Sequence, residues 1–171
     1  VRVESSKKLD DLSGLNELLD ITAKRHKFKR FSHKYIQKEF KSFAQDDNAL
    51  VFNAYLPDGS LDSSAVIIFY GNTAAYRHSA SLNKNKHLPT SYCLQWEVIK
   101  EAKKRGIKIY NFWGIAPDNS GRNHPFRGIT HFKKGFGGRK RNLLHCQDLP
   151  IRNKYYLNWL IESFRRVRRG F

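Results

Sequence analysis

A lysine set among aromatic and glycine residues marks the segment of this sequence where chemistry is best expected. Lys133 follows Phe132 and leads within three residues into Phe136-Gly-Gly138. No Asp or Glu occurs between Asn119 and Cys146, so this segment offers no carboxylate base. A lysine ammonium held in place stabilises the charge of a phosphate or of a reaction's oxyanion. The simpler alternative is that Lys133 is one phosphate-contacting cation of a basic run, made of Lys133, Lys134, Arg139, Lys140 and Arg141.

A second candidate, Arg77, lies in the middle of a predicted strand over residues 73–82. Strict alternation places Ala75, Arg77 and Ser79 on one face of this strand and Tyr76, His78 and Ala80 on the other. An arginine in a central strand is costly unless it meets an anion or a carboxylate, so we expect a site role for Arg77. The seven histidines are scattered, and His145-Cys146 has no partner ligands at metal-binding spacing. No metal site is therefore predicted.

Composition and charge restrict the class of protein. The chain has 171 residues, 40% of them hydrophobic and 13% aromatic, which predicts one domain with a substantial core rather than disorder. The net charge of +17 attracts polyanions such as nucleic acid, anionic lipid headgroups or phosphorylated small molecules, unless it only solvates the surface. Two cysteines, no long apolar run and no signal peptide favour the cytoplasm. Because the sequence begins at Val1 and lacks methionine, we expect a part of a longer protein.

The hydrophobic patterns predict an α+β fold. Two helices come first, over residues 9–26 and from an N-cap at Ser32 through Phe43. Strands follow at 49–56 and 64–70, joined by a turn at 57–60, and a third antiparallel strand lies at 73–82. A helix over 89–105 leads to a strand at 108–113, which the helical crossover makes parallel to its predecessor. A short helix near 125–134, a strand near 139–147 and a terminal helix from about 153 complete the chain.

Two basic segments each allow two interpretations. Residues 24–34 hold six Lys or Arg, either as a solvated junction between helices or as an edge that faces an anion. The terminal helix carries Tyr156, Trp159 and Phe164 at helical spacing and ends in basic residues 165–169. Such a helix can lie on a membrane surface, but packing against the domain is more common, so packing is favoured.

The predicted order of elements, α-α-β-β-β-α-β-α-β, resembles that of the N-acetyltransferase-like (GNAT) fold. This resemblance implies a three-layer arrangement in which helices flank a mixed, mostly antiparallel sheet. Acetyl-CoA users of this fold bind the pyrophosphate through a glycine-bearing turn before the helix that follows the central strand. Here that turn, residues 83–89, has no glycine, and Pro89 lacks an amide hydrogen. The fold is therefore expected without its usual cofactor, and no cofactor is predicted.

Several motifs together resemble the Fem peptidyltransferases of bacterial cell-wall synthesis (FemABX). They are Tyr110-Asn-Phe-Trp-Gly114, Phe132-Lys133, Phe136-Gly-Gly138, Thr22-Ala-Lys-Arg25 with Arg30 and Tyr35 after it, and the helix from Tyr92 to Trp96. The resemblance covers nearly the whole chain but only the second of that family's two GNAT-like domains. The first domain normally supplies much of the groove for the precursor, so we expect this single domain to need it for activity.

The resemblance implies an enzyme that moves an amino acid from aminoacyl-tRNA to the stem-peptide amine of a peptidoglycan precursor. The precursor is UDP-linked or lipid-linked, so peripheral contact with the inner face of the membrane is implied as well. Lys133 and Phe132 are implied as catalytic residues. The residues implied or suggested to bind substrate are Arg30, Tyr35, Arg77, Tyr92, Lys134 and Arg139. Asn111 stands where the family often has Asp, which argues against a carboxylate role there.

Two other functions are compatible with the same residues. The basic segments 133–141 and 165–169, with aromatics between them, suit a non-catalytic nucleic-acid-binding module. A GNAT-like acyltransferase with another donor, such as acyl carrier protein or CoA, is the second alternative.

Overall fold

The computed structural model describes residues 1–26, 28–85, 87–121, 124–144 and 147–169. The chain divides into two compact units, Val1–Lys133 and Lys134–Phe171, and the first contains the sheet and the helices around it. Within the described ranges, no helix is both long enough and apolar enough to cross a membrane.

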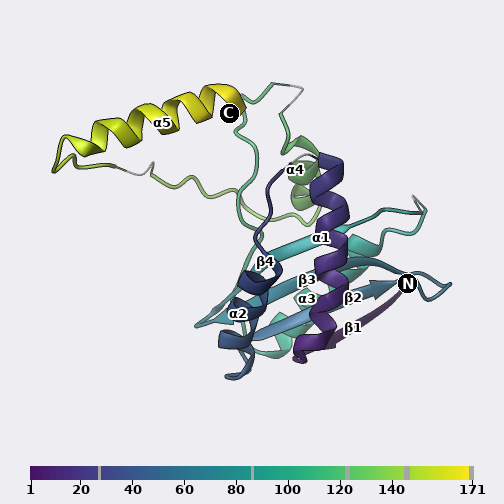
Figure 1. Ribbon diagram of the computed structural model, residues 1–171. Helices are drawn as coiled ribbons and strands as arrows, with labels where there is room; N and C mark the ends of the chain where they lie inside the picture. The colour runs from purple at the N-terminus through teal and green to yellow at the C-terminus, as the bar shows by residue number, and fades with distance from the viewer. Residues whose placement is uncertain (27, 86, 122–123, 145–146, 170–171) are drawn as a thin grey trace. The chain divides into compact units, whose positions relative to one another are not determined.

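A five-stranded sheet forms the centre of the first unit (Figure 1). Its strands lie in the order of the sequence: β1 (Arg2–Ser6), β2 (Ala49–Tyr55), β3 (Leu61–Tyr70), β4 (Thr73–Ser81) and β5 (Ile109–Asn111). The first four pair antiparallel, and β5 pairs parallel to β4, with Thr73 opposite Ile109. The mixed, mostly antiparallel sheet and the parallel crossover were both predicted, and both are confirmed.

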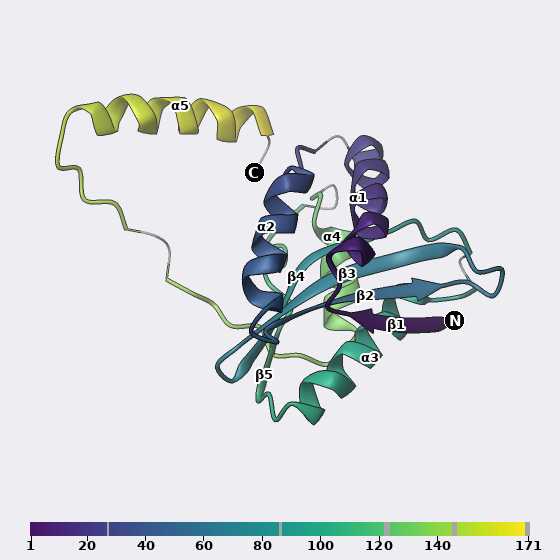
Figure 2. The same cartoon turned by 60° about the horizontal axis from the view of Figure 1, so that its bottom comes forward.

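Helices cover both faces of the sheet (Figures 1 and 2). A short 3-10 turn (Leu9–Asp11) leads into α1 (Leu12–His26), which lies with α2 (His33–Ala44) on one face. The opposite face is covered by α3 (Thr90–Lys104). The last two helices are α4 (Arg127–Lys134) and α5 (Lys154–Arg169). The predicted three-layer arrangement is confirmed.

The central strands β2 and β3 are buried on both faces, which explains why their sequences are nearly continuous apolar runs. One core packs Leu15, Phe40 and other side chains of α1 and α2 onto one face of the sheet. The other packs Leu94 and Val98 of α3 onto Ile67 and its neighbours on the opposite face. Two consecutive residues of a strand thus enter two different cores.

Local signals in the sequence are realised as expected. The Ser32 hydroxyl accepts the amide of Tyr35 at 3.2 Å and so caps α2. The turn between β2 and β3 closes with the Leu56 amide on the Ser60 carbonyl at 2.9 Å, and Gly59 there has a φ of +82°. That left-handed conformation is what the glycine in this turn permits.

Two strand predictions were wrong. Strand β1 was not expected, because Arg2–Ser6 is short and polar; it pairs with β2 at the edge of the sheet. The strand expected near 139–147 does not form in its described residues, 139–144 and 147. Three successive cations and an asparagine open that segment, and such residues have little preference for a pleated, half-buried surface. The masked part of this prediction, residues 145–146, lies outside the described residues, as does the negative metal prediction made there.

The alternation expected along β4 was also wrong, because the strand contains a bulge. Val66 of β3 pairs with His78 and the next residue, Ile67, pairs with Tyr76, so Arg77 is an extra residue without a partner across the strands. Tyr76 therefore joins the core under α3, whereas His78 reaches α2 on the other face. Arg77 and His78 consequently both face α2, although they are neighbours in the strand.

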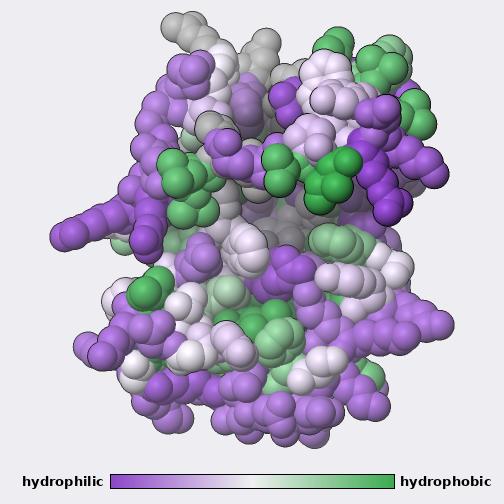
Figure 3. Space-filling view, turned by 90° about the vertical axis from the view of Figure 1, so that its left-hand side faces the viewer, coloured by the Kyte–Doolittle hydropathy of each residue, from purple (hydrophilic) through white to green (hydrophobic). Residues whose placement is uncertain are grey.

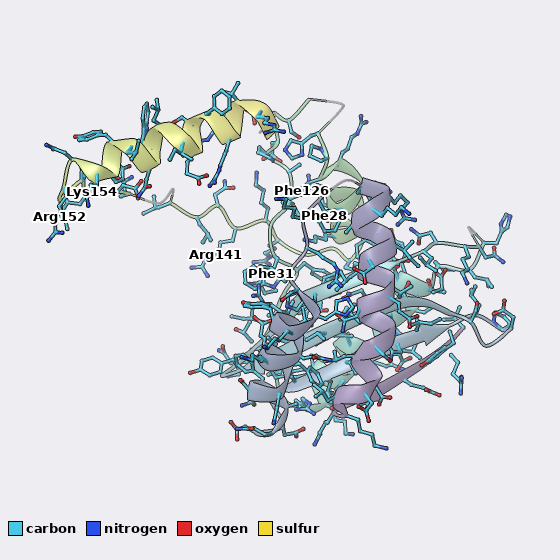
Figure 4. All side chains as sticks on the ribbon, viewed as in Figure 1. Phe28, Phe31, Phe126, Arg141, Arg152 and Lys154 are labelled. Carbon is cyan, nitrogen blue, oxygen red and sulfur yellow. The ribbon has the colours of Figure 1, made fainter. Side chains whose placement is uncertain are left out.

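The second unit carries α5, drawn in yellow in Figure 1. No described side chain of this helix is buried, and its large apolar residues are exposed, Phe164 at 71% and Val167 at 82% among them. Arg141 and Arg152 precede the helix and Lys154 begins it (Figure 4). Helix α5 is thus both basic and apolar on its surface.

Candidate active site

Lys133 lies in the last turn of α4, and its position is fixed by the segment that follows β5. Its Nζ donates a hydrogen bond to the Gly114 carbonyl at 2.7 Å. The Thr130 hydroxyl one turn earlier in α4 accepts the amide of Ala116 at 2.8 Å, which ties the helix to the same segment. The lysine is half-buried, and this burial lowers the pKa of Lys133 below its ordinary value of 10.5.

Phe132, the residue before the lysine, faces α3. Its ring meets that of Tyr92 edge to face, with 4.9 Å between the ring centroids. Tyr92 stands in the first turn of α3, so the start of α3 and the end of α4 lie against each other. The structure thereby brings together three of the predicted site residues, Lys133, Phe132 and Tyr92; we call them, with Gly114, the lysine cluster.

Strand β5 is short but firmly placed. The Tyr110 hydroxyl donates to Oε1 of the fully buried Gln95 on α3 at 2.6 Å. The Asn111 side chain accepts the Trp113 amide at 2.8 Å, which supports the left-handed conformation of Trp113, with a φ of +63°. Asn111 therefore shapes the turn that presents Gly114 to the lysine.

A second group of site residues surrounds Glu39 on α2. Its Oε1 accepts from Nε of Arg77 at 3.0 Å and from Nη2 at 2.7 Å. Its Oε2 lies 2.5 Å from Nε2 of His78. The bulge in β4 makes this possible, because it turns two consecutive side chains toward the same glutamate. Arg77 thus meets the carboxylate that its place in a central strand required.

Aromatic rings surround the Arg77 guanidinium, which lies 5.4 Å from the centroid of Trp113 and 5.9 Å from that of Phe31. Phe31 stacks on Tyr35 with 4.7 Å between centroids; Figure 4 shows Phe31 ahead of the first turn of α2. Phe31, Tyr35 and Trp113 are all exposed. We call these three residues, with Glu39, Arg77 and His78, the arginine cluster. Trp113 of the arginine cluster and Gly114 of the lysine cluster are consecutive residues, so the two clusters are joined there.

The charges of the arginine cluster follow from burial and contact. Burial would raise the pKa of Glu39, but the hydrogen bonds and positive charge of Arg77 and His78 together lower it below its ordinary value. Burial lowers the pKa of His78 and outweighs the opposing effect of Glu39. Glu39 is therefore held as a carboxylate between the Arg77 guanidinium and Nε2 of His78.

The other predicted residues are less central. Arg30 pairs with Asp20 of α1 at 2.6 Å and also donates to the Phe31 carbonyl, and only 12% of its side chain is exposed. It orders the connection between α1 and α2, so the structure does not bring it into either cluster. Lys134 ends α4 and is exposed, and Arg139 belongs to the second unit.

Sequence reasoning missed Glu39, His78, Phe31 and Trp113. The one available signal was that Glu39 is the single acidic residue of α2, four residues after Tyr35. In the described part of the chain, no group of three His, Cys, Asp or Glu side chains is placed to hold a metal ion.

The side chain of Asp62, a residue of β3, contacts the first residue of α3. Asp62 is fully buried; its Oδ1 accepts the Lys84 amide at 2.9 Å and its Oδ2 accepts the hydroxyl of Thr90, the first residue of α3. The Ser63 hydroxyl lies 2.7 Å from the same Thr90 hydroxyl. The loop between β4 and α3 is thus tied to the protein's own side chains.

Solved structures define the class of fold. A crystal structure of a predicted acetyltransferase with acetyl-CoA from Clostridium acetobutylicum superposes with a TM-score of 0.64 at 11% identity, covering 89% of this chain and 98% of that one. The crystal structure of FemX superposes with a TM-score of 0.71 at 18% identity, covering 80% of this chain and 50% of that one. The fold is therefore GNAT-like, as predicted.

Sequence comparison gives the family. The model of the FemAB family matches residues 58–163, and the chain belongs to this family. A lipid II:glycine glycyltransferase of Staphylococcus haemolyticus (strain JCSC1435) is 26% identical over 149 residues, which are 80% of this chain and 35% of the relative. The aminoacyltransferase FemA of Staphylococcus epidermidis is 38% identical over 61 residues, 36% of this chain and 14% of the relative. The chain thus spans about a third or less of these relatives.

Proposed function

We propose that this chain is the part of a tRNA-dependent aminoacyltransferase that carries Lys133, and that the whole protein transfers an amino acid to the stem-peptide amine of a peptidoglycan precursor. The observation that carries the proposal is the half-buried ammonium of Lys133, bound to the Gly114 carbonyl at 2.7 Å in a chain of the FemAB family. Names of relatives support it, since one is a lipid II:glycine glycyltransferase and another an aminoacyltransferase.

The reaction is the aminolysis of an ester. The precursor's amine attacks the ester carbonyl of the aminoacyl-tRNA, and a tetrahedral oxyanion forms. The bond to the ribose oxygen then breaks; this oxygen takes up a proton, and the attacking nitrogen loses one. An ammonium has three N–H donors, so Lys133 keeps two for the oxyanion or the terminal phosphate while it binds Gly114. Because residues 119–146 hold no carboxylate, we assign the proton transfer to the substrates and solvent.

The acceptor site is proposed at the arginine cluster. Arg77, Tyr35 and the rings beside them offer a cation and exposed aromatic surface next to the turn that holds Lys133. Tyr92, through its ring contact with Phe132, lines the lysine side. A substrate contact by Arg30, which pairs with Asp20, stays a prediction.

Charge supports tRNA as the donor. The chain carries +17, and hydrophilic side chains dominate the face that Figure 3 shows. Lys134 and Arg139 are proposed to contact the backbone of the tRNA acceptor end, where each neutralised phosphate contributes to binding. Four expectations stay predictions: peripheral contact with the inner face of the membrane, packing of the terminal helix against the domain, cytoplasmic location, and a further domain that completes the precursor groove.

The Asp62 contacts favour this donor over CoA. In acetyl-CoA users the start of the equivalent helix binds pyrophosphate. Here a buried carboxylate already takes the Thr90 hydroxyl and the Lys84 amide there, and a second negative group at that place would be repelled.

The test is to incubate the longest natural form of the protein with charged tRNAs and either UDP-linked or lipid-linked precursor, and to weigh the products. We expect the precursor to gain the mass of one or more aminoacyl residues only when charged tRNA is present. A precursor modified with acetyl-CoA instead would establish the acyltransferase alternative. Binding of tRNA without any product would establish the nucleic-acid-binding alternative.

A further inference from the structure

We propose that Glu39 is a positioning residue of this enzyme: by holding Arg77 against Trp113, it fixes the turn whose carbonyl holds Lys133. The proposal rests on the proposed function, because its main readout is aminoacyl transfer. Glu39 touches neither the lysine nor Gly114. It acts on the lysine through a chain of three contacts, from Glu39 to Arg77, from Arg77 to Trp113, and from Gly114 to Lys133.

The first contact is rigid because both oxygens of Glu39 are engaged. Arg77 occupies Oε1 through two nitrogens, at 3.0 and 2.7 Å, and His78 occupies Oε2 at 2.5 Å. Only 15% of the glutamate side chain is exposed, and 24% of that of Arg77. A charged hydrogen bond with two donors sets the orientation of a guanidinium as well as its position.

The second contact matters because the Trp113 backbone is strained. A tryptophan with a φ of +63° is in a region that bulky side chains seldom adopt, and such residues persist only where their surroundings hold them. Two contacts do so here. The Asn111 side chain accepts the Trp113 amide at 2.8 Å, and the Arg77 guanidinium lies 5.4 Å from the indole centroid.

The third contact transmits the effect to the chemistry. Gly114 follows Trp113 directly, and its carbonyl accepts the hydrogen bond of the Lys133 ammonium at 2.7 Å. If the turn relaxes toward an ordinary backbone conformation, this carbonyl moves and the ammonium moves with it. Displacements of about 1 Å at a reacting group cost up to roughly 100-fold in rate.

The chain offers a matched control on the other side of the sheet. Glu101 of α3 accepts from Nε of Arg105 at 2.8 Å, is 24% exposed, and its arginine lies 4.4 Å from the centroid of Phe69. This glutamate–arginine–aromatic group has the same chemistry as that of Glu39 but belongs to neither cluster. Glu101→Gln therefore reports what the loss of such a pair does to stability alone.

The decisive experiment is a double-mutant cycle in the full enzyme. We expect Glu39→Gln to lower kcat, measured at saturating substrates, about tenfold, within the range given by small displacements. Glu101→Gln should leave kcat unchanged. In a Lys133→Met background, Glu39→Gln should have no further effect on kcat, since the group that it positions is gone. An equal loss in both backgrounds, or no loss in either, would overturn the proposal.

A second measurement does not depend on activity. Hydrogen exchange of the Trp113 and Ala116 amides, whose acceptors are the Asn111 and Thr130 side chains, reports the order of the turn. Glu39→Gln should speed this exchange, and Glu101→Gln should not. Unchanged exchange in both variants would refute the proposal. If exchange responds but the native enzyme transfers no amino acid, the proposed function fails while the structural link from Glu39 to the turn stands.

Discussion

Replacing Lys133 by methionine gives the sharpest test of the proposed chemistry. Methionine keeps an unbranched side chain and its packing but removes the ammonium and its hydrogen bond to Gly114. Loss of one preorganised donor to an oxyanion costs roughly 100- to 1,000-fold in kcat, or about 2.7–4 kcal/mol. The fold should lose far less. A hydrogen bond to a charged group contributes about 1.5–3 kcal/mol, and this is partly offset because the half-buried ammonium no longer has to be desolvated.

The pH dependence gives the same test a second readout. Burial lowers the pKa of Lys133, so its ammonium is lost at a lower pH than that of an exposed lysine. The active form is the cation. The ratio of wild-type to Lys133→Met rates should therefore be largest at low and neutral pH and fall as the pH rises through this lowered pKa. Because both proteins use the same substrates, titration of the attacking amine cancels from the ratio.

The assay is single-turnover transfer from labelled aminoacyl-tRNA, with Lys100→Met as control. Lys100 lies on α3, 54% exposed, and pairs with Glu97, so its loss removes the same charge outside the site. We expect the control to keep the wild-type rate. A Lys133→Met protein that folds and transfers within threefold of wild type would refute the catalytic role, and equal losses in both variants would point to general tRNA attraction instead.

Three further predictions concern stability, measured by urea unfolding. The pKa of Glu39 is lowered below 4.5 in the folded state, so its stabilisation is present above pH 4.5 and is lost as the pH falls through the folded-state value; Glu39→Gln should flatten this acid limb. Thr90→Val removes the donor to Oδ2 of the buried Asp62 carboxylate, whose Oδ1 keeps the Lys84 amide, and should lower the free energy of unfolding by about 1–3 kcal/mol; an unchanged free energy of unfolding would mean that the contact is not formed. Phe40→Ala, at a side chain 1% exposed, should cost about 3–5 kcal/mol, and a cost below 1 kcal/mol would contradict the core assignment.

Much of the fold was predictable because its signals are local. The apolar runs of β2 and β3, the Ser32 cap and the glycine turn each act within a few residues. Strand β1 was not predictable in this way, because Arg2–Ser6 is polar and becomes a strand only by pairing with β2. The bulge in β4 was not predictable either, since it depends on how Val66 and Ile67 of the neighbouring strand pair with it.

The candidate site likewise contains residues that local sequence signals reveal and residues that only packing brings together. Lys133 and Phe132 stand in a motif that a sequence displays directly, and the structure places both beside the end of β5. Arg77 was singled out because a central strand makes an arginine costly, but that argument requires a carboxylate without saying which one. Glu39 lies 38 residues away on a helix, and only packing of α2 onto the sheet brings it to 2.7 Å.

This chain has the GNAT-like fold, but the start of its α3 contacts the buried side chain of Asp62. The first turn of a helix presents unpaired amides and a partial positive charge, which in acetyl-CoA users is directed at pyrophosphate. In this chain Pro89 removes one amide, Thr90 is turned inward to Asp62, and the loop amide of Lys84 bonds the same carboxylate. An anion supplied by the protein itself makes the loop part of the core. Recognition of the proposed donor would then rest on side-chain cations, and the 32 Lys and Arg against 15 Asp and Glu support the proposal of a polynucleotide.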